Sequence, residues 1–427
     1  MASRAARPPR LQHIHIPGST HCLPSYALAV AIQSKLQQRL LDYKAAVATA
    51  SEDSSRPLPP PPPPPTILSF IPAPTYTLGR RQTSPLCPVE AQRLRGRLDV
   101  YWYKHDKSSK GKTAEEGVDS RVINGQTLDH DHHYASFYPA IHNAPRGGLT
   151  TYHGPGQVVF WPVMDLKSPL HRHFSVRDYA CLLEKTTIAS IAEAATSSLP
   201  SFPPEAVRQK EVKGFTTENP GVWVKRRWAD GDEDEADGRP GPEGEEERKI
   251  AALGVHLRRH VTGLGVAVNC SMPVRGPESY DPWRRIVACG LEGKRVTSLA
   301  YEMLDYLDQA RWIRAMGPQP LVLLEGQYKN KNRESWAEAP VLETQMLRAW
   351  PEFFARSLQG RPEEASADGA RGSDSTTTMT RDDLVDDLTI DEVLGKGWEN
   401  TIDVPEEEQY ITATRKRVVG TIPLEST

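Results

Sequence analysis

The sequence predicts an α+β fold, in which strands and helices are mixed without the strict strand–helix–strand alternation of a parallel α/β protein. Two observations carry this prediction. Short apolar runs that are typical of strands are spread along the 427 residues, and longer segments with apolar residues at helical spacing lie between them. The length leaves room for one large domain or two ordinary ones, and no internal repeat is visible.

The expected elements follow in chain order. Strands are predicted for the apolar runs at residues 66–78, 98–103, 158–166, 250–257 and 264–269. Helices are predicted at residues 28–43, 176–191, 297–307 and 341–358. Ser175 can cap the second of these helices, whose apolar face is formed by Val176, Tyr179, Leu183 and Ile191.

Composition divides the chain into a main domain and polar additions. The hydrophobic content is only 38% and there are 37 prolines, so part of the chain is expected to be unfolded. The insertions are a proline-terminated stretch, a polar stretch rich in turn residues, and a loop with ten acidic residues against two arginines. The predicted division is an N-terminal segment (1–27), a main domain (28–358) with disordered insertions at 45–65, 104–133 and 229–248, and a largely disordered tail (359–427).

Charge and cysteine content exclude several classes of protein. The net charge of −3 gives no attraction to nucleic acid or to an anionic membrane, and no apolar run is long enough to span a bilayer. Five cysteines without a repeated spacing suggest neither a disulfide framework nor a metal site. Arginines precede the first acidic residue, Asp42, as in a mitochondrial transit segment. Mitochondrial import is therefore expected, with a cytoplasmic location as the alternative.

The segment 146–157 is the least random part of the sequence. It reads Arg-Gly-Gly-Leu-Thr-Thr-Tyr-His-Gly-Pro-Gly-Gln and comes directly before an apolar run. Glycines let a backbone approach a ligand closely, and a loop of this kind at the mouth of a strand is often a binding site. A glycine-rich turn between two strands is the alternative.

Three side chains could carry chemistry. Cys289 follows an apolar run and precedes Gly290, near a predicted helix start that would lower the pKa of its thiol. Lys249 enters an apolar strand and could act as a base or pair with a thiolate. His153 in the glycine-rich loop could donate a hydrogen bond to a bound carbonyl or shuttle a proton. Each has a structural alternative: an inert buried thiol, a surface charge and a histidine that pins the loop.

Together these segments resemble the octanoyltransferases of lipoate biosynthesis. The matching segments, in order, are Thr75 to Arg80, Arg146 to Gln157, Lys249 to Gly254, Gly265 to Asn269, and Cys289–Gly290 with Val296 to Leu299. The resemblance implies a biotin/lipoate protein ligase-like fold, a mixed sheet with flanking helices. It implies transfer of an octanoyl group from octanoyl-acyl carrier protein to a lysine of lipoyl domains, such as those of 2-oxoacid dehydrogenase acyltransferase subunits and the glycine cleavage H protein. No cofactor, metal, nucleic acid or membrane is implied.

The resemblance also implies roles for individual residues. Cys289 is expected to form the acyl thioester, and Lys249 to lower the pKa of that thiol and to act as general base and acid. The residues expected to line the acyl site are Arg146, Gly147, Gly148, Leu149, Thr150, Thr151, Tyr152, His153, Ala252, Leu253, Gly254, Gly265, Val266 and Ala267. The chain departs from the family at Leu264, where many relatives have histidine, and at Ala288, where proline is common.

Three other functions stay open at this point. An ATP-dependent lipoate–protein ligase on the same fold would need no cysteine nucleophile, so Cys289 argues against it. A non-catalytic scaffold that binds lipoyl domains would not need both Lys249 and Cys289. A hydrolase that uses Cys289 and His153 would need a path for water to the thioester.

Overall fold

The computed structural model describes most of the chain. The described residues are 10–19, 22–52, 59–103, 121–123, 126–128, 132–201, 211–227, 233–234, 239–240, 245–274, 276–287, 293–303, 325–326, 339–359 and 379–412. Cys289 lies outside these ranges, in the gap between Val287 and Gly293.

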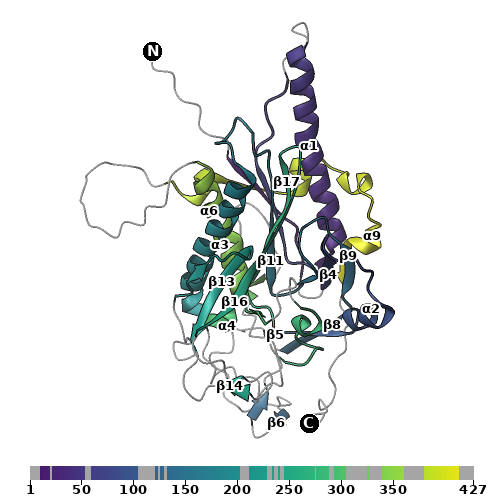
Figure 1. Cartoon of the computed structure of the whole chain (residues 1–427), viewed down its shortest axis with the longest axis vertical. Coiled ribbons are helices and arrows are strands. Elements are labelled where there is room, and N and C mark those ends of the chain that lie inside the picture. The colour runs from purple at the N-terminus through teal and green to yellow at the C-terminus, as the bar shows by residue number, and fades with distance from the viewer. Residues whose placement is uncertain are drawn as a thin grey trace, which may run out of the picture.

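A nine-stranded mixed sheet runs through the middle of the molecule (Figure 1). Its order is β12 (Gly214–Phe215), β13 (Gly221–Arg227), β16 (Glu245–Arg258), β17 (Val261–Asn269), β11 (Gln157–Val163), β3 (Thr66–Phe70), β1 (Leu11–His15) and β21 (Val385–Leu388), with β18 (Arg295–Val296) beside β16. Neighbours from β12 to β3 are antiparallel, whereas β1 is parallel to both β3 and β21. A sheet of mixed direction with helices on its faces confirms the predicted α+β class.

Helices cover both faces of this sheet, and β11 shows why. Its residues alternate between two cores, because successive side chains of a strand point to opposite faces. Phe160 faces α3 (Val176–Ser198) and α6 (Val341–Leu358), and its ring stacks on Trp350 at 4.7 Å. Trp161 faces α1 (Tyr26–Glu52) on the other side. All of β11 is buried, as its continuous apolar sequence suggests.

The helices predicted at 28–43, 176–191 and 341–358 are confirmed, and α4 (Leu299–Met303) confirms part of the one predicted at 297–307, whose residues 304–307 lie outside the described ranges. Ser175 caps α3 by accepting from Asp178 N–H, and Asp178 returns a bond to the Ser175 backbone. Tyr179, Leu183 and Ile191 are buried as expected, but Val176 is exposed because it lies in the first turn, before the helix meets the sheet. None of the helices in the described ranges is long and apolar enough to cross a bilayer.

A smaller sheet carries the glycine-rich segment. It consists of β10 (Thr151–His153), β4 (Thr75–Leu78) and β9 (Ala140–Asn143). The predicted strand at 66–78 is therefore two strands, β3 and β4, separated by a corner that contains Pro72 and Pro74; proline has no N–H to donate to a sheet.

The other paired strands are β2 (Cys22–Pro24) with β22 (Tyr410–Thr412), β5 (Leu98–Tyr103) with β8 (His132–Phe137), β6 (Arg121–Ile123) with β7 (Gln126–Leu128), β14 (Glu233–Asp234) with β15 (Arg239–Pro240), and β19 (Glu325–Gly326) with β20 (Ala339–Pro340). The remaining helices are α2 (Pro88–Leu94), α4 (Leu299–Met303), α7 (Arg381–Leu384), α8 (Ile390–Leu394) and α9 (Glu406–Gln409).

The predicted ends of the domain are wrong in the described ranges. Residues 11–15, placed in a separate N-terminal segment, form β1 inside the main sheet, where Ile14 is fully buried. Residues 379–412, placed in a disordered tail, include β21, which extends the sheet beyond β1. His13 and Arg381 both bind Asp387, so a buried polar cluster fixes β21. Short strands of this kind carry too few apolar residues to stand out in sequence.

The predicted insertions are also ordered in part. The insertion at 45–65 overlaps the end of α1, because the alanine-rich residues 45–50 continue the helix. The insertion at 104–133 contains the short hairpin of β6 and β7 and the start of β8, and the one at 229–248 contains β14, β15 and the first residues of β16. Residues 59–65 of the first insertion are described and lead directly into β3, and the other residues of the three predicted insertions lie outside the described ranges.

Candidate active site

The segment 146–157 joins the small sheet to the main sheet. It leads from a loop through β10 into Gln157, the first residue of β11. The loop is tied to the end of β4 by Arg80 N–H, which donates to the carbonyl of Arg146 at 2.9 Å. The predicted position of this segment, at the mouth of a buried strand, is confirmed.

Arg146 is buried, and its guanidinium holds the loop in shape. One terminal nitrogen donates to the carbonyl and to the hydroxyl of Thr77, at 2.7 and 2.8 Å. The other donates to the carbonyls of Leu149 and Gly147, at 2.8 and 3.0 Å. A charged donor that serves four acceptors fixes the loop more firmly than neutral hydrogen bonds would.

The three segments expected to line the acyl site lie side by side. The register of β16 and β17 pairs Ala252 with Ala267, Leu253 with Val266, and Gly254 with Gly265. A Cβ atom on Gly254 would lie 2.9 Å from Cδ of Arg146. Because glycine has no side chain there, the stem of Arg146 packs directly on β16, and the loop forms one wall beside the strand pair.

The rest of the loop divides between two sides of β10. Thr151 and His153 point one way along the strand and Tyr152 points the other way. The Tyr152 ring packs against Tyr76 and Trp283, with centroids 5.1 and 5.8 Å apart. Thr150, Thr151, Tyr152 and His153 are buried, whereas Gly147 is exposed and Gly148 and Leu149 are half-buried.

A β-bulge in β16 decides where Lys249 points. Val222 of β13 lies opposite Ala251, but the next residue, Trp223, lies opposite Lys249, so Ile250 is an extra residue in the strand. Ile250 and Ala251 consequently both face the α3 and α6 core. Simple alternation would have sent Lys249 into that core.

The bulge turns Lys249 to the opposite face, which also carries Ala252 and Gly254. A Cβ atom on Gly221, the partner of Ala252, would lie 3.1 Å from Cε of Lys249. Directly opposite residues in an antiparallel pair share a face. Lys249 therefore lies on the same face of β16 as two of the residues expected to line the acyl site.

The ammonium of Lys249 is buried against an aromatic ring. It lies 4.9 Å from the centroid of the Trp223 indole, within the range of a cation–π contact. Lys294 approaches the same ring at 5.9 Å, but it is half exposed and also pairs with Glu247 at 2.9 Å. Lys249 thus stands in a more apolar setting than its neighbour.

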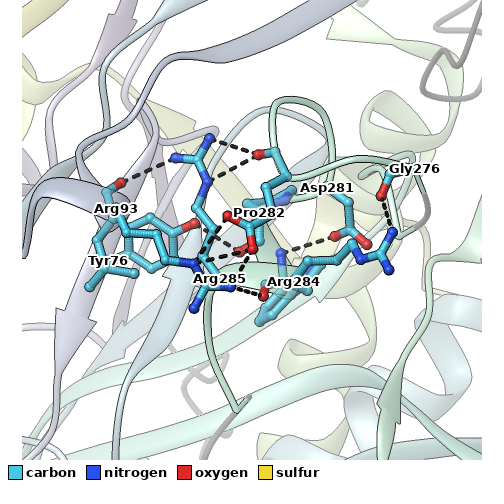
Figure 2. Close-up of polar contacts among 10 residues, drawn as sticks. Tyr76, Arg93, Gly276, Asp281, Pro282, Arg284 and Arg285 are labelled. Atoms are coloured by element: carbon cyan, nitrogen blue, oxygen red, sulfur yellow. Dashed lines mark hydrogen bonds and ion pairs between the residues drawn. The ribbon is translucent and has the colours of Figure 1, made fainter. Parts of the chain in front are cut away.

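Cys289 and Ala288 lie outside the described residues, so the role predicted for the cysteine stays a prediction. The main chain before it is firmly held (Figure 2). Arg285 donates to four carbonyls, those of Leu94, Gly96, Arg97 and Glu278. Tyr76 Oη donates to the carbonyl of Pro282 at 2.8 Å.

The same turn contains a buried carboxyl group. Asp281 accepts from Trp283 N–H at 2.9 Å, and burial raises the pKa of Asp281 to about 7. Arg93 donates to Glu278 and to the carbonyl of Arg284, and so joins α2 to the turn (Figure 2). These contacts fix the chain as far as the residues directly before the Cys289 segment.

His153 is held neutral in a buried aromatic stack. Its ring lies 5.7 Å from that of Tyr26, nearly parallel to it, and Tyr26 in turn stacks on His142. Burial lowers the pKa of His153 to about 4, and the charge of Arg146 acts in the same direction. At neutral pH the imidazole is therefore uncharged.

A line of buried hydrogen bonds runs from His153 toward Lys249. Nδ1 of His153 lies 2.8 Å from Gln157 Oε1, and Gln157 Nε2 donates to Asn269 Oδ1 at 2.9 Å. Asn269 Nδ2 donates to the carbonyl of Thr297 at 3.0 Å. Thr297 N–H donates to the carbonyl of Lys249 at 2.9 Å, so the glycine-rich loop is linked to the strand that carries the lysine.

Gln157, Asn269 and Thr297 of this line, and the Trp223 ring under the lysine, were not predicted as site residues. Gln157 and Asn269 close the two segments quoted for the resemblance, and a polar residue at the end of an apolar run is the signal that could have found them. Trp223 carries no such signal, because its pairing with Lys249 depends on the register of β13 and β16.

Leu264, one of the departures from the family pattern, adopts a left-handed conformation with φ of +59°. Its N–H donates to Gln33 Oε1 of α1 at 2.6 Å, and its side chain joins the α1 core. Leu264 thus anchors β17 to α1 beside Gly265.

Comparison with known proteins gives the family to which the chain belongs. Residues 138–317 match the family model of the lipoyl protein ligase A/B catalytic domain. A protein of Schizosaccharomyces pombe named "Probable octanoyltransferase" is 30% identical over 289 residues, which cover 68% of this chain and 86% of that protein. A mitochondrial octanoyl-acyl-carrier-protein:protein N-octanoyltransferase of Danio rerio is 29% identical, over 65% of this chain and 79% of that protein.

These matches place the chain in the octanoyltransferase family, as the resemblance predicted, and the protein is a transferase. Among solved structures, the bipartite lipoate protein ligase of Thermoplasma acidophilum covers 96% of this chain and 98% of its own, with a TM-score of 0.35 and 10% identity.

Proposed function

We propose that this protein transfers an octanoyl group from octanoyl-acyl carrier protein to a lysine of a lipoyl domain, through an octanoyl thioester on Cys289. Membership of the octanoyltransferase family supports octanoyl transfer in protein lipoylation. The single structural observation that carries the chemistry is the bulge in β16. It places the buried Lys249 on the face of Ala252 and Gly254, toward the proposed acyl site.

In the first step the Cys289 thiolate attacks the carbonyl carbon of the donor thioester. The tetrahedral intermediate collapses and expels the thiolate of the carrier's prosthetic arm, which takes up a proton. One thioester replaces another, so this step is nearly thermoneutral. Lys249 favours it because a nearby ammonium stabilises the thiolate and can supply the proton.

In the second step the neutral amine of the acceptor lysine attacks the Cys289 thioester. The amine loses a proton, for which Lys249 is the proposed base, and Cys289 leaves as the thiolate. We propose that backbone N–H groups of residues 146–153, or of Gly290, donate hydrogen bonds to the tetrahedral oxyanion. Because an amide is more stable than a thioester, the transfer needs no ATP and no phosphate-binding loop.

Mass spectrometry of the intact protein tests the intermediate. After incubation with octanoyl-acyl carrier protein and no ATP, the wild type should gain one octanoyl group and Cys289→Ala should gain none. Cys181→Ala is the matched control, since Cys181 is an exposed cysteine on α3, and it should be acylated like the wild type. An unmodified wild type, or acylation of Cys289→Ala, contradicts the proposed intermediate.

An ATP-dependent lipoate–protein ligase is the second candidate, since the matching family model covers both lipoyl protein ligase types. Such an enzyme activates the free acid as an adenylate. The two are separated by supplying octanoate with ATP in place of the acylated carrier. Product from octanoate and ATP alone would favour the ligase.

The proposed acceptors are the lipoyl domains of 2-oxoacid dehydrogenase acyltransferase subunits and the glycine cleavage H protein. The proposed location is the mitochondrion, in line with the name of the Danio rerio relative. A fluorescent reporter fused after residue 427 of the full chain should enter mitochondria. A uniformly cytoplasmic signal would favour the alternative location.

A further inference from the structure

The side-chain orientations around His153 follow from one group that can only accept hydrogen bonds. The backbone carbonyl of Thr297 can only accept, and the side-chain amide of Asn269 lies 3.0 Å from it. The NH₂ group of Asn269 must therefore face Thr297, because the reverse orientation would place two oxygens in contact. This leaves Oδ1 of Asn269 facing Gln157.

The orientation of Asn269 in turn fixes the orientation of the Gln157 amide. An oxygen of Asn269 requires the NH₂ group of Gln157, which lies 2.9 Å away. That NH₂ group also faces the carbonyl of Tyr152 at 3.4 Å, a second acceptor with the same requirement. Oε1 of Gln157 therefore faces His153 Nδ1 at 2.8 Å, so Nδ1 must carry the proton.

We propose that Gln157 and Asn269 are positioning residues that hold His153 in the Nδ1–H tautomer, so that Nε2 enters the proposed octanoyl transfer as a hydrogen-bond acceptor. This inference rests on the proposed function for its catalytic meaning but not for its geometry. Nε2 makes no hydrogen bond to any residue that the structure describes, and the Tyr26 ring stacks on the face of the imidazole and does not occupy the hydrogen-bonding direction of Nε2.

The tautomer decides which substrate group can form a hydrogen bond with Nε2 of His153. An unprotonated Nε2 cannot donate to the acyl oxygen, which was the role considered for this residue from sequence. It can accept from an N–H or S–H group, and the reaction supplies two: the amine of the acceptor lysine and the thiol released from the carrier. The amine of the second step is the partner proposed here, because the hydrogen bond would point its lone pair toward the thioester carbon.

Nitrogen NMR of the wild-type protein tests the tautomer directly. The protein is labelled with ¹⁵N-histidine, and the His153 signals are identified by their absence in His153→Gln. At pH 7 we expect a protonated Nδ1 and an unprotonated Nε2. A protonated Nε2 or an imidazolium would overturn the assignment, whatever the result of the acyl-transfer assay.

A charge change at Gln157 tests the positioning role. In Gln157→Glu the carboxylate still accepts from Nδ1 but adds a negative charge, which should raise the pKa of His153 by about one unit or more. The pH at which the His153 nitrogen signals titrate should move up by the same amount. Gln82→Glu, at an exposed amide on the loop after β4, is the control and should leave that pH unchanged.

Asn269→Leu gives a second measurement. It removes the contact that orients Gln157, so the His153 spectrum should show both tautomers. A pure Nδ1–H spectrum in a folded Asn269→Leu variant would show that Asn269 does not position the histidine.

Discussion

Nζ of Lys249 lies 4.9 Å from the centroid of the Trp223 ring, and Nζ of Lys294 lies on the same ring at 5.9 Å. The two ammonium groups differ in setting. Lys249 is buried on the face of the proposed acyl site, whereas Lys294 is half exposed and paired with Glu247. This neighbouring pair offers a matched test of which lysine activates Cys289.

Lys249→Met should slow alkylation of Cys289 at neutral pH by about tenfold, because removal of a nearby positive charge raises the pKa of a thiol. Lys294→Met should change the rate less than about twofold, because an exposed, paired charge is largely screened by solvent. The measurement is the iodoacetamide rate against pH, read on the Cys289 peptide by mass spectrometry. Equal profiles for wild type and Lys249→Met would contradict the role proposed for this lysine.

Gly254→Val should destabilise the protein by about 1–3 kcal/mol, because its Cβ would lie 2.9 Å from Arg146 Cδ and force the arginine off the strand. The effect should be smaller in the background of Arg146→Ala, where the clashing stem is gone. Urea unfolding of the four proteins in this double-mutant cycle measures the coupling. Additive losses would show that the two residues do not press on each other.

The stability of the protein should depend on pH through buried histidines. Burial lowers the pKa of His15 to about 3, below its ordinary value of 6.5, and the neighbouring His13 acts in the same direction. As the pH falls below 6.5 the unfolded chain binds a proton at His15 that the folded chain does not. The free energy of unfolding therefore falls, by about 2 kcal/mol for this residue between pH 6.5 and 5.

His15→Gln isolates that contribution. Glu343 and Asp281, whose pKa values burial raises to about 7, act in the opposite direction in this pH range, so the wild-type slope alone is not diagnostic. We expect the difference in unfolding free energy between pH 7 and pH 5 to shift by about 2 kcal/mol in His15→Gln. The exposed His173→Gln should behave as the wild type.

A chain that ends at residue 378 should lose stability, because it lacks β21 and the charges around Asp387. His13 and Arg381 contact Asp387 at 2.7 and 2.5 Å, and the shorter chain also loses the buried Leu384 and Val385, each worth about 1.5–3 kcal/mol when fully buried. A chain that ends at residue 412 keeps these contacts and is the control. Urea midpoints that agree between the two would contradict a structural role for residues 379–412.

Sequence patterns predicted the parts of this fold that depend on local rules. The apolar runs of β11 and β17, the Ser175 cap of α3 and the glycine-rich loop before β11 all follow from short-range chemistry. The extent of α1 was underestimated, because its last turns are polar and only their alanines favour a helix. The segments expected to line the acyl site lie side by side, because residues 252–254 and 265–267 belong to the paired strands β16 and β17 and Arg146 packs on Gly254.

The orientation of Lys249 and the two ends of the chain could not be predicted in this way. Strand alternation sends Lys249 toward the core, and only the pairing of β16 with β13 introduces the extra residue that reverses it. β1 and β21 are short and stabilise each other, so neither has a strong signal alone. Both failures come from contacts between residues far apart in the chain.

The long stretch of chain between β1 and β21 delays the pairing of these two strands during synthesis. His13 and Asp387, which meet across these strands, are 374 residues apart. At about 5–20 residues per second a ribosome needs roughly 20–75 s to make the intervening chain. Throughout that interval one edge of β1 exposes unpaired backbone groups, which are a template for aggregation. The nascent protein should therefore depend on chaperones longest at β1.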